Sequence, residues 1–277
     1  IGLVSAFFVS RDELFRCTFL SVGHGLATII ELPSGQTLLY DAGTIGDGTL
    51  AERIVERALW SRGISRIDGI VISHADHDHY SGVFGLLEKF PVGTLFLTQS
   101  SVDASQEGIT ELCLLADAKG TNIQLVQQGD ELVTDSHPDY EIELRVIHPP
   151  GGFQAKADNS HSVVLEIVCQ GKRVLLTGDL EKEGFPEFFK LESRHCDVLL
   201  APHHGGRAAN VPQLYEWATP DTVIVSTNDV SRSEPLRGTI EDAELLTTRE
   251  SGAISVTIEA NGQLHLEEFL SRNPRNE

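Results

Sequence analysis

Apolar residues in the first third of the chain recur at the spacings of short strands and of one amphipathic helix. Three apolar runs rich in β-branched residues predict strands, with a Pro-Ser-Gly turn between the second and third: residues 15–22, 27–32 and 37–40. Apolar residues then recur on one helical face between Leu50 and Leu59, and Gly63 ends this predicted helix. A fourth strand is predicted at residues 67–72. The chain therefore begins as a hairpin followed by a helix and a strand.

The same alternation continues to the end of the chain. Further helices are predicted at residues 80–90, 104–119, 181–191 and 210–218. Further strands are predicted in short pieces within 122–148 and at residues 94–97, 163–169, 173–176, 197–201, 222–226, 253–260 and 263–269. Strands that alternate with helices in this way indicate an α/β fold.

Two stretches follow the same plan, at residues 27–79 and 163–204. Each reads as a hairpin, an aspartate at its end, a helix, a strand and a loop that contains histidines. We interpret this likeness as an internal duplication, with general α/β patterning as the alternative, because the two stretches share element order more than residues.

The composition adds limits on domains and on partners. The 277 residues carry 41 acidic and 21 basic side chains, a formal charge of -20 that opposes nucleic-acid binding by phosphate neutralisation. Residues 1–9 form an apolar run too short to span a bilayer, and they lack the basic start of a signal peptide. We expect residues 1–14 to be a leader or linker from a longer protein, residues 15–270 to be one domain, and residues 271–277 to be a tail.

The loop after the strand at 67–72 concentrates metal-binding side chains. Three imidazoles and two carboxylates lie within residues 74–79, interrupted only by Ala75. Imidazole and carboxylate groups are common ligands of divalent metals, so we predict a metal site here. A polar, solvated turn is the alternative interpretation.

Other polar residues follow predicted strands in the same manner. Asp41, Asp179 and the pair His203 and His204 come at or just after apolar runs, and ligands of α/β sheets gather at the carboxyl ends of strands. A carboxylate beside a buried strand is costly unless it is paired or coordinated, so Asp179 is a candidate ligand. Capping of the following helix is the alternative role for Asp179, and the two roles are compatible.

The pattern HxDxDH at residues 74–79 resembles the HxHxDH signature of the metallo-β-lactamase superfamily. Seven ordered motifs look like those of the ComEC competence-protein hydrolase domain, at residues 19–25, 30–35, 39–43, 73–79, 159–165, 175–181 and 201–206. The resemblance implies an α/β fold of the metallo-β-lactamase type, an αββα four-layer sandwich.

The resemblance also implies a set of ligands for two divalent metal ions. It makes His74 and Asp76 ligands of one metal, and Asp78 and His79 ligands of the other. Asp179 would bridge the two metals, and His204 is the expected last ligand.

Three more residues acquire expected roles from the resemblance. His161 could complete the first metal site, and a surface histidine at the start of a strand is the alternative. Asp41 is expected to orient the histidine loop by hydrogen bonding. His203, if it binds no metal, could protonate a leaving oxygen or bind a phosphate. The expected catalytic residues are His203 and the metal ligand Asp78. His77 is expected not to be a ligand.

The implied activity is phosphodiester hydrolysis by a nuclease that degrades the non-transported DNA strand during DNA uptake. Asp76 in place of a histidine makes the site richer in oxygen, which favours manganese, with zinc as the alternative. The expected substrate is single-stranded DNA, bound weakly by this domain alone because of its acidic charge. The remaining domains of a membrane-embedded bacterial parent are the other expected partners, with this domain on the extracytoplasmic side.

Two departures from the family pattern leave other functions open. Leu26 stands where the family commonly has an aspartate, and residues 231–235 replace a loop that often contains a histidine. One alternative is a different hydrolase on the same fold, acting on phosphorylcholine esters, lactones or thioesters. The other is a domain that has lost catalysis and serves as a scaffold for a membrane transporter.

Overall fold

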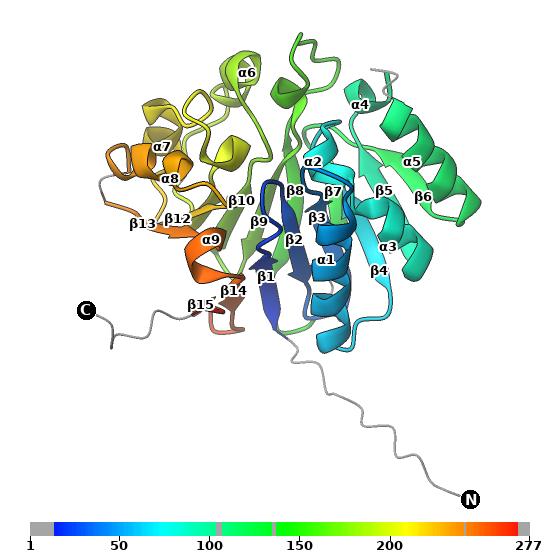
Figure 1. The fold of residues 1–277 in the computed structure, drawn as a ribbon. Helices are drawn as coiled ribbons and strands as arrows, with labels where there is room; N and C mark the ends of the chain where they lie inside the picture. Colours follow the sequence, from blue (N-terminus) through cyan, green and yellow to red (C-terminus); the bar gives the residue numbers. More distant parts are fainter. Residues whose placement is uncertain (1–13, 104–106, 135–136, 241, 271–277) are drawn as a thin grey trace, which may run out of the picture.

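Two β-sheets face each other and carry helices on their outer sides (Figure 1). This computed structural model describes residues 14–103, 107–134, 137–240 and 242–270. The predicted tail and nearly all of the predicted leader lie outside these ranges. Among the described helices, none combines the length and apolar character needed to cross a bilayer.

The first sheet contains eight strands in the described ranges, in the order β15-β14-β1-β2-β3-β4-β5-β6. Its strands β1 to β6 are Phe15–Phe19, Ala27–Glu31, Thr37–Ala42, Ile67–Val71, Val92–Leu97 and Asn122–Leu125. Its last two strands, β14 and β15, are Ile254–Ile258 and Leu264–Glu268. Strands β3 to β6 run parallel, whereas β1 and β2 form antiparallel pairs.

The second sheet contains seven strands in the described part of the chain, in the order β13-β12-β11-β10-β9-β8-β7. Its strands β7 to β13 are Glu131–Thr134, Ile142–His148, Val164–Cys169, Lys172–Leu176, Val198–Leu200, Thr222–Val225 and Glu244–Thr247. Strands β10 to β13 are parallel to one another, and β7 to β10 pair antiparallel.

The helices divide between the two outer faces. Figure 1 shows α1, α3 and α5 beside the first sheet and α6, α7 and α8 beside the second. The α-helices α1 to α9 are Thr49–Ser61, His77–Tyr80, Val83–Lys89, Gln99–Asp103, Glu107–Ala118, Phe185–Phe188, Pro212–Ala218, Val230–Arg237 and Thr248–Ser251. Within the described residues, the 3-10 turns η1 to η3 are Asp158–His161, Lys182–Gly184 and Pro202–Gly205.

The buried apolar residues of the described ranges form three clusters, which account for this arrangement in layers. One cluster lies between the sheets and combines side chains of both, including Phe19 and Leu165. A second joins the first sheet to α1, α3 and α5, and a third joins the second sheet to α6 and α7. Burial of apolar surface on both faces of each sheet stabilises the four layers. The expected αββα sandwich is thus confirmed.

Some predicted elements differ from those observed. The helix predicted at 80–90 is α3, preceded by the single turn α2. Only a 3-10 turn and α6 occupy the range 181–191, where Pro186 lies near the start of the short helix. Helix α5 lies within the range predicted as helix at 104–119, of which residues 104–106 lie outside the described ranges.

The two stretches with a common plan also fold alike. In the first, the hairpin β2-β3 is followed by β4 parallel to β3, and in the second, the hairpin β9-β10 is followed by β11 parallel to β10. The histidine loops follow β4 and β11, so each leaves the carboxyl end of a parallel strand. The Tyr40 hydroxyl donates to the Val163 carbonyl 2.5 Å away and links the two sheets near these ends.

Candidate metal centre

Five segments bring polar side chains to one end of the two sheets. Asp41 lies at the end of β3, and the first histidine loop follows β4. Asp179 follows β10, and His203 with His204 lies in the turn after β11. The fifth segment is the loop between β1 and β2, which carries His24. Strand ends far apart in the sequence thus contribute to one site, as expected for an α/β fold.

Three buried residues form what we call the inner group: His74, His79 and Asp179. Their ligand atoms lie within 4.8 Å of one another. The His79 Nε2 is 3.2 Å from the Asp179 Oδ1, and the rings of His74 and His79 are 4.2 Å apart between centroids. None of the three residues is more than 3% exposed. Such a cluster of buried imidazole and carboxylate groups has the donor set of a transition-metal site.

The tautomer of His79 suits it to metal binding. Its Nδ1–H donates to the Asp41 Oδ2 at 2.8 Å, because the carboxylate can only accept. The other Asp41 oxygen accepts a 2.7 Å hydrogen bond from the Ser73 backbone N–H, which holds the carboxylate at the start of the loop. In the neutral ring the lone pair of His79 therefore lies on Nε2, the nitrogen that faces Asp179. Asp41 occupies the supporting position that the family motif implies for it.

The charges of the inner group favour ionised Asp179. Burial alone would raise the pKa of this carboxyl, but His79 and His204 outweigh that effect and hold the pKa well below its usual value. Burial likewise opposes a charged His79, while Asp179 and Asp41 raise the pKa of His79 well above its usual value. Without a cation, a proton on His79 balances the two carboxylates, and a bound metal would take over that role.

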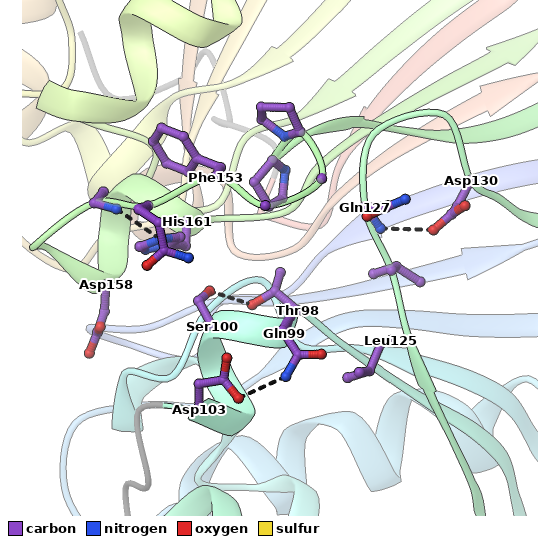
Figure 2. Close-up of a pocket in the computed structure, with 17 residues that line it drawn as sticks. Thr98, Gln99, Ser100, Asp103, Leu125, Gln127, Asp130, Phe153, Asp158 and His161 are labelled. Atoms are coloured by element: carbon purple, nitrogen blue, oxygen red, sulfur yellow. Dashed lines mark hydrogen bonds between the residues drawn. The ribbon is translucent and has the colours of Figure 1, made fainter.

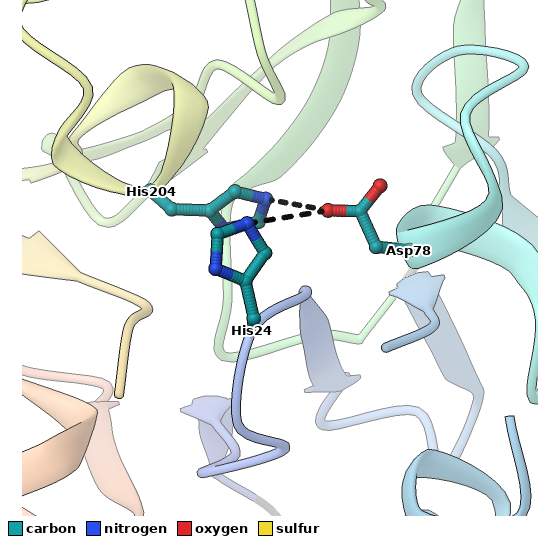
Figure 3. A group of neighbouring side chains, drawn as sticks. All are labelled: His24, Asp78 and His204. Carbon is teal, nitrogen blue, oxygen red and sulfur yellow. Dashed lines mark ion pairs between the residues drawn. The ribbon is translucent and has the colours of Figure 1, made fainter. Parts of the chain in front are cut away.

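Three further residues form what we call the outer group: His24, Asp78 and His204. Figure 3 shows both imidazoles directed at one oxygen of Asp78. That oxygen, Oδ2, is 3.2 Å from the His204 Nε2 and 4.0 Å from the His24 Nε2. Burial alone would raise the pKa of Asp78, but the combined effect of His204 and His79 is larger and lowers it, so the net shift is downward. The carboxylate is therefore ionised at neutral pH.

The histidines of the outer group are oriented by different means. The His204 Nδ1–H donates to the Ser226 carbonyl at 3.1 Å, which leaves Nε2 to face Asp78. His203 and His204 both have left-handed backbones, with φ of 52° each, and this tight turn directs His204 inward. The pKa of His24 is lowered by burial and by the charges of His204 and Arg232, so its ring is neutral and able to coordinate.

Asp179 connects the two groups, because its Oδ1 is also 3.7 Å from the His204 Nε2. In the described ranges, four buried ligand atoms of this centre lack any hydrogen-bond partner: the Nε2 atoms of His74, His79 and His204, and the Asp179 Oδ1. Buried polar atoms without a hydrogen bond are costly, and here the Nε2 atoms of His79 and His204 both face the Asp179 Oδ1. The donors present therefore fit a pair of divalent metal ions.

The grouping differs from the expected division of ligands in two respects. His79 lies with His74 and Asp179, whereas it was expected to share a metal with Asp78. Adjacent residues on the single turn α2 point about 100° apart, so Asp78 and His79 face different groups. The outer group also includes His24, which sequence reasoning missed. Because β1 runs parallel to β3, the loop after β1 reaches the same end of the sheet, and this rule could have identified it.

Asp76 and His203 lie at the border of the centre. The Asp76 Oδ2 is 3.3 Å from the His74 Nε2, but its side chain is 43% exposed. The His203 Nδ1 is 3.2 Å from a Glu181 oxygen, and its Nε2 is 3.8 Å from the Asp179 Oδ2. Neither residue belongs to the two compact groups. His203 therefore lies beside the ligands with a ring nitrogen directed toward them.

His161 and His77 point elsewhere. His161 lines a neighbouring pocket of about 620 Å³, shown in Figure 2, between the carboxyl ends of β5 and β6 and the loop after β8. Its Nε2 accepts the Ala155 backbone N–H at 3.2 Å, and its ring lies beside Phe153. The structure thus does not bring His161 into either group. The His77 Nε2 lies 2.6 Å from the Gly46 carbonyl oxygen, outside both groups.

The chain is similar in sequence to known proteins. Residues 20–95 match the sequence model of the metallo-beta-lactamase superfamily. ComE operon protein 3 of Bacillus subtilis is 26% identical over 77% of this chain and 28% of its own length. Recombination protein 2 of Haemophilus influenzae is 30% identical over 75% of this chain and 23% of its own length. The chain thus spans about a quarter of the length of these curated relatives.

A solved structure confirms the fold. A diphosphatase from the PhnP family superposes with a TM-score of 0.51 at 14% sequence identity, covering 88% of this chain and 98% of that one. At this identity the likeness extends to the architecture alone.

Proposed function

We propose that this metallo-β-lactamase domain, related to ComEC-type competence proteins over about three quarters of its length, is a two-metal phosphodiesterase that cleaves DNA. Single-stranded DNA is the proposed substrate, and the proposed setting is DNA uptake by a larger membrane protein. The fold and the relatives support a metal-dependent hydrolase, and the nuclease activity is our inference from the site.

The convergence of four buried ligand atoms that have no hydrogen-bond partner in the described ranges carries this proposal. Two divalent cations held by the inner and outer groups would activate water and stabilise negative charge on the oxygens of an in-line displacement at phosphorus. Asp179 faces both groups and would hold the two positions together. Asp41 and Ser226 fix the imidazoles that they contact in the tautomers required.

His203 is the proposed proton donor. It is partly exposed beside the ligands, and its Nδ1 lies 3.2 Å from an oxygen of the buried Glu181 carboxylate, which orients the ring. The Arg232 guanidinium donates to the His203 carbonyl at 3.0 Å and fixes the backbone of this turn. A proton at the His203 Nε2 would be available to a leaving oxygen bound beside Asp179.

The acidic charge of the chain defines the expected binding mode. A formal charge of -20 leaves few cations for phosphate contacts, so we propose weak binding of DNA by this domain alone. Other domains of the parent protein would supply affinity. The donor set contains four imidazoles when His24 is counted, so zinc is as strong a candidate as the manganese expected from Asp76.

A nuclease assay with defined metals tests the proposal. The metal-free chain is reloaded with Mn²⁺ or Zn²⁺ and incubated with labelled single-stranded DNA, duplex DNA, a phosphorylcholine ester, a lactone and a thioester. We expect cleavage of single-stranded DNA with at least one metal and none with chelator. Faster turnover of one of the other esters would replace the nuclease by that activity.

Two variants assign the reaction to this centre. Asp179→Asn is expected to abolish cleavage, because it removes the carboxylate that both groups share. His77→Gln is the matched control, since His77 lies on the same loop and faces the Gly46 carbonyl instead. Equal cleavage by Asp179→Asn and the wild type would show that a contaminating nuclease is responsible and would refute the proposal.

A further inference from the structure

The loop between β1 and β2 is built to hold His24 against the histidine loop. A Cβ atom on Gly25 would lie 2.3 Å from the Gly43 carbonyl oxygen and 2.8 Å from the Asp78 carbonyl oxygen, so only glycine allows this approach. The Leu26 backbone N–H donates to the Asp78 carbonyl at 3.3 Å. The backbone that carries His24 thus packs directly on the backbone that carries Asp78.

The His24 carbonyl fixes the loop from the other side. It accepts hydrogen bonds from the Ile45 backbone N–H at 2.8 Å and from the Thr44 hydroxyl at 3.0 Å. The Thr44 hydroxyl also contacts the Val22 carbonyl, and the Thr44 backbone N–H donates to Ser81. This network joins the loop to the segment after β3 and to the end of α2. His24 is therefore positioned by main-chain contacts, although its side chain is partly exposed.

The imidazole of His24 has a position suited to metal binding. Its Nε2 and the ligand atoms of Asp78 and His204 lie within 4.8 Å of one another, and the His24 and His204 rings are 5.1 Å apart. Tetrahedral ligands about 2.0 to 2.1 Å from zinc lie roughly 3.3 Å apart, close to the 3.2 Å and 4.0 Å separations found here. Small side-chain rotations would close the remaining difference.

Leu26 is the other residue of this loop that bears on the outer group. This side chain is 2% exposed and packs in the cluster between the sheets, so it offers the centre no ligand. Without His24 the outer group would have one imidazole and Asp78, together with the shared Asp179. In this loop Leu26 replaces the aspartate that is common in the family, and the His24 nitrogen is the donor that the loop offers to the outer group.

We infer that His24 is a direct ligand of the outer metal and determines whether that metal is bound. This inference depends on the metal-binding part of the proposed function and adds a ligand to it. It concerns the outer position alone, because His24 lies outside the inner group.

Metal content at buffered free zinc concentrations tests the inference. The full chain, its His24→Ala variant and its His24→Gln variant are dialysed against a series of zinc buffers, and bound zinc is measured by mass spectrometry. We expect two zinc ions per wild-type chain. His24→Ala should keep one site of wild-type affinity and weaken the other by more than ~100-fold, beyond the ~10–100-fold loss expected when a residue only orients a ligand. His24→Gln, whose amide is a poor zinc ligand, should weaken the same site by at least tenfold.

The controls separate failure of this inference from failure of the proposed function. His77→Gln should bind two zinc ions with wild-type affinities. Two unchanged sites in both His24 variants would overturn the role of His24 and leave the two-metal centre intact. A wild-type chain that binds no zinc or manganese would instead overturn the proposed function and the inference together. Circular dichroism of each variant in chelator verifies the fold, and His24→Gln keeps the side-chain volume if His24→Ala does not fold.

Discussion

The inner and outer groups use the same kinds of ligand in different surroundings. All three inner residues are buried, and the Nδ1 atoms of both histidines contact the Asp41 carboxylate or the Ser73 hydroxyl. In the outer group the side chains of His24 and Asp78 are 25% and 18% exposed, and only His204 is fully buried. Preorganised, desolvated ligands bind metal more tightly than partly solvated ones. We therefore expect a tight inner metal and an outer metal that exchanges more readily.

Asp179 is the residue that makes the two groups one centre, and its loss should have the largest effect. Asp179→Asn removes the negative charge that lies 3.2 Å from the His79 Nε2 and 3.7 Å from the His204 Nε2. The metal affinities of the inner and outer positions should both fall by more than ~100-fold, because each position loses a direct ligand. Zinc content measured in zinc buffers checks this.

Glu181→Gln is the matched control for the Asp179 variant. Glu181 is equally buried and lies two residues away, but it contacts His203 instead of the ligand atoms. Both metals should remain in this control. If Asp179→Asn lost only one metal, Asp179 would belong to a single group, and the inner and outer groups would be two independent sites.

Asp41→Asn should affect the inner metal alone and more mildly. The amide oxygen can still accept from the Ser73 backbone N–H, but the amide NH₂ then faces the His79 Nδ1. A donor at that position favours the tautomer with its proton on Nε2, the nitrogen that faces Asp179. The affinity of the inner site should fall by ~10–100-fold, as for other residues that orient a metal ligand.

The Asp41→Asn prediction is checked by the two-site zinc titration. The outer dissociation constant should stay unchanged, because His24, Asp78 and His204 do not contact Asp41. A parallel loss at both positions would indicate that the inner metal must bind before the outer one. An unchanged inner affinity would show that Ser73, whose hydroxyl lies 3.2 Å from the His79 Nδ1, can orient His79 unaided.

The sequence predicted the fold and most residues of this centre, but it did not predict how those residues are grouped around the two metal positions. Apolar periodicity located most strands, and the rule that ligands gather at strand ends selected Asp41, Asp179 and the two histidine loops. The partition between metals depends on where Asp78 and His79 point from one helical turn. That direction is set by packing of α2 on the loops at residues 23–26 and 43–44, which a linear pattern does not encode.

His161 and His24 show that a sequence motif alone does not determine which histidines reach the centre. His161 was expected at the metal because of its motif, but the 3-10 turn η1 directs its ring toward Phe153 and the pocket. Sequence reasoning missed His24, because the carboxylate that the family motif commonly has at residue 26 is replaced by Leu26. Its role depends on the close backbone approach at Gly25, a contact between segments that are distant in the sequence.

His148 is a buried histidine outside the metal centre, and a comparison with it gives the smallest of the expected effects. Like His204, it donates its Nδ1–H to a backbone carbonyl, that of Ser162 at 3.0 Å, and has a buried Nε2 without a partner in the described ranges. No carboxylate ion pair is found for it there. Burial therefore lowers the pKa of His148 to about 4, whereas carboxylates raise that of His79.

The pH dependence of stability follows from this difference. The unfolded chain takes up a proton at His148 near pH 6.5, but the folded chain does so only near pH 4, so folding is disfavoured as the pH falls between these values. Between about pH 7.5 and about pH 5 the wild type should lose about 2 kcal/mol more unfolding free energy than His148→Gln. Urea denaturation of both chains in chelator measures this difference. Equal losses would mean that His148 has the same pKa in the folded and unfolded chains. Burial without a neighbouring carboxylate would then not distinguish His148 from the histidines of the metal centre.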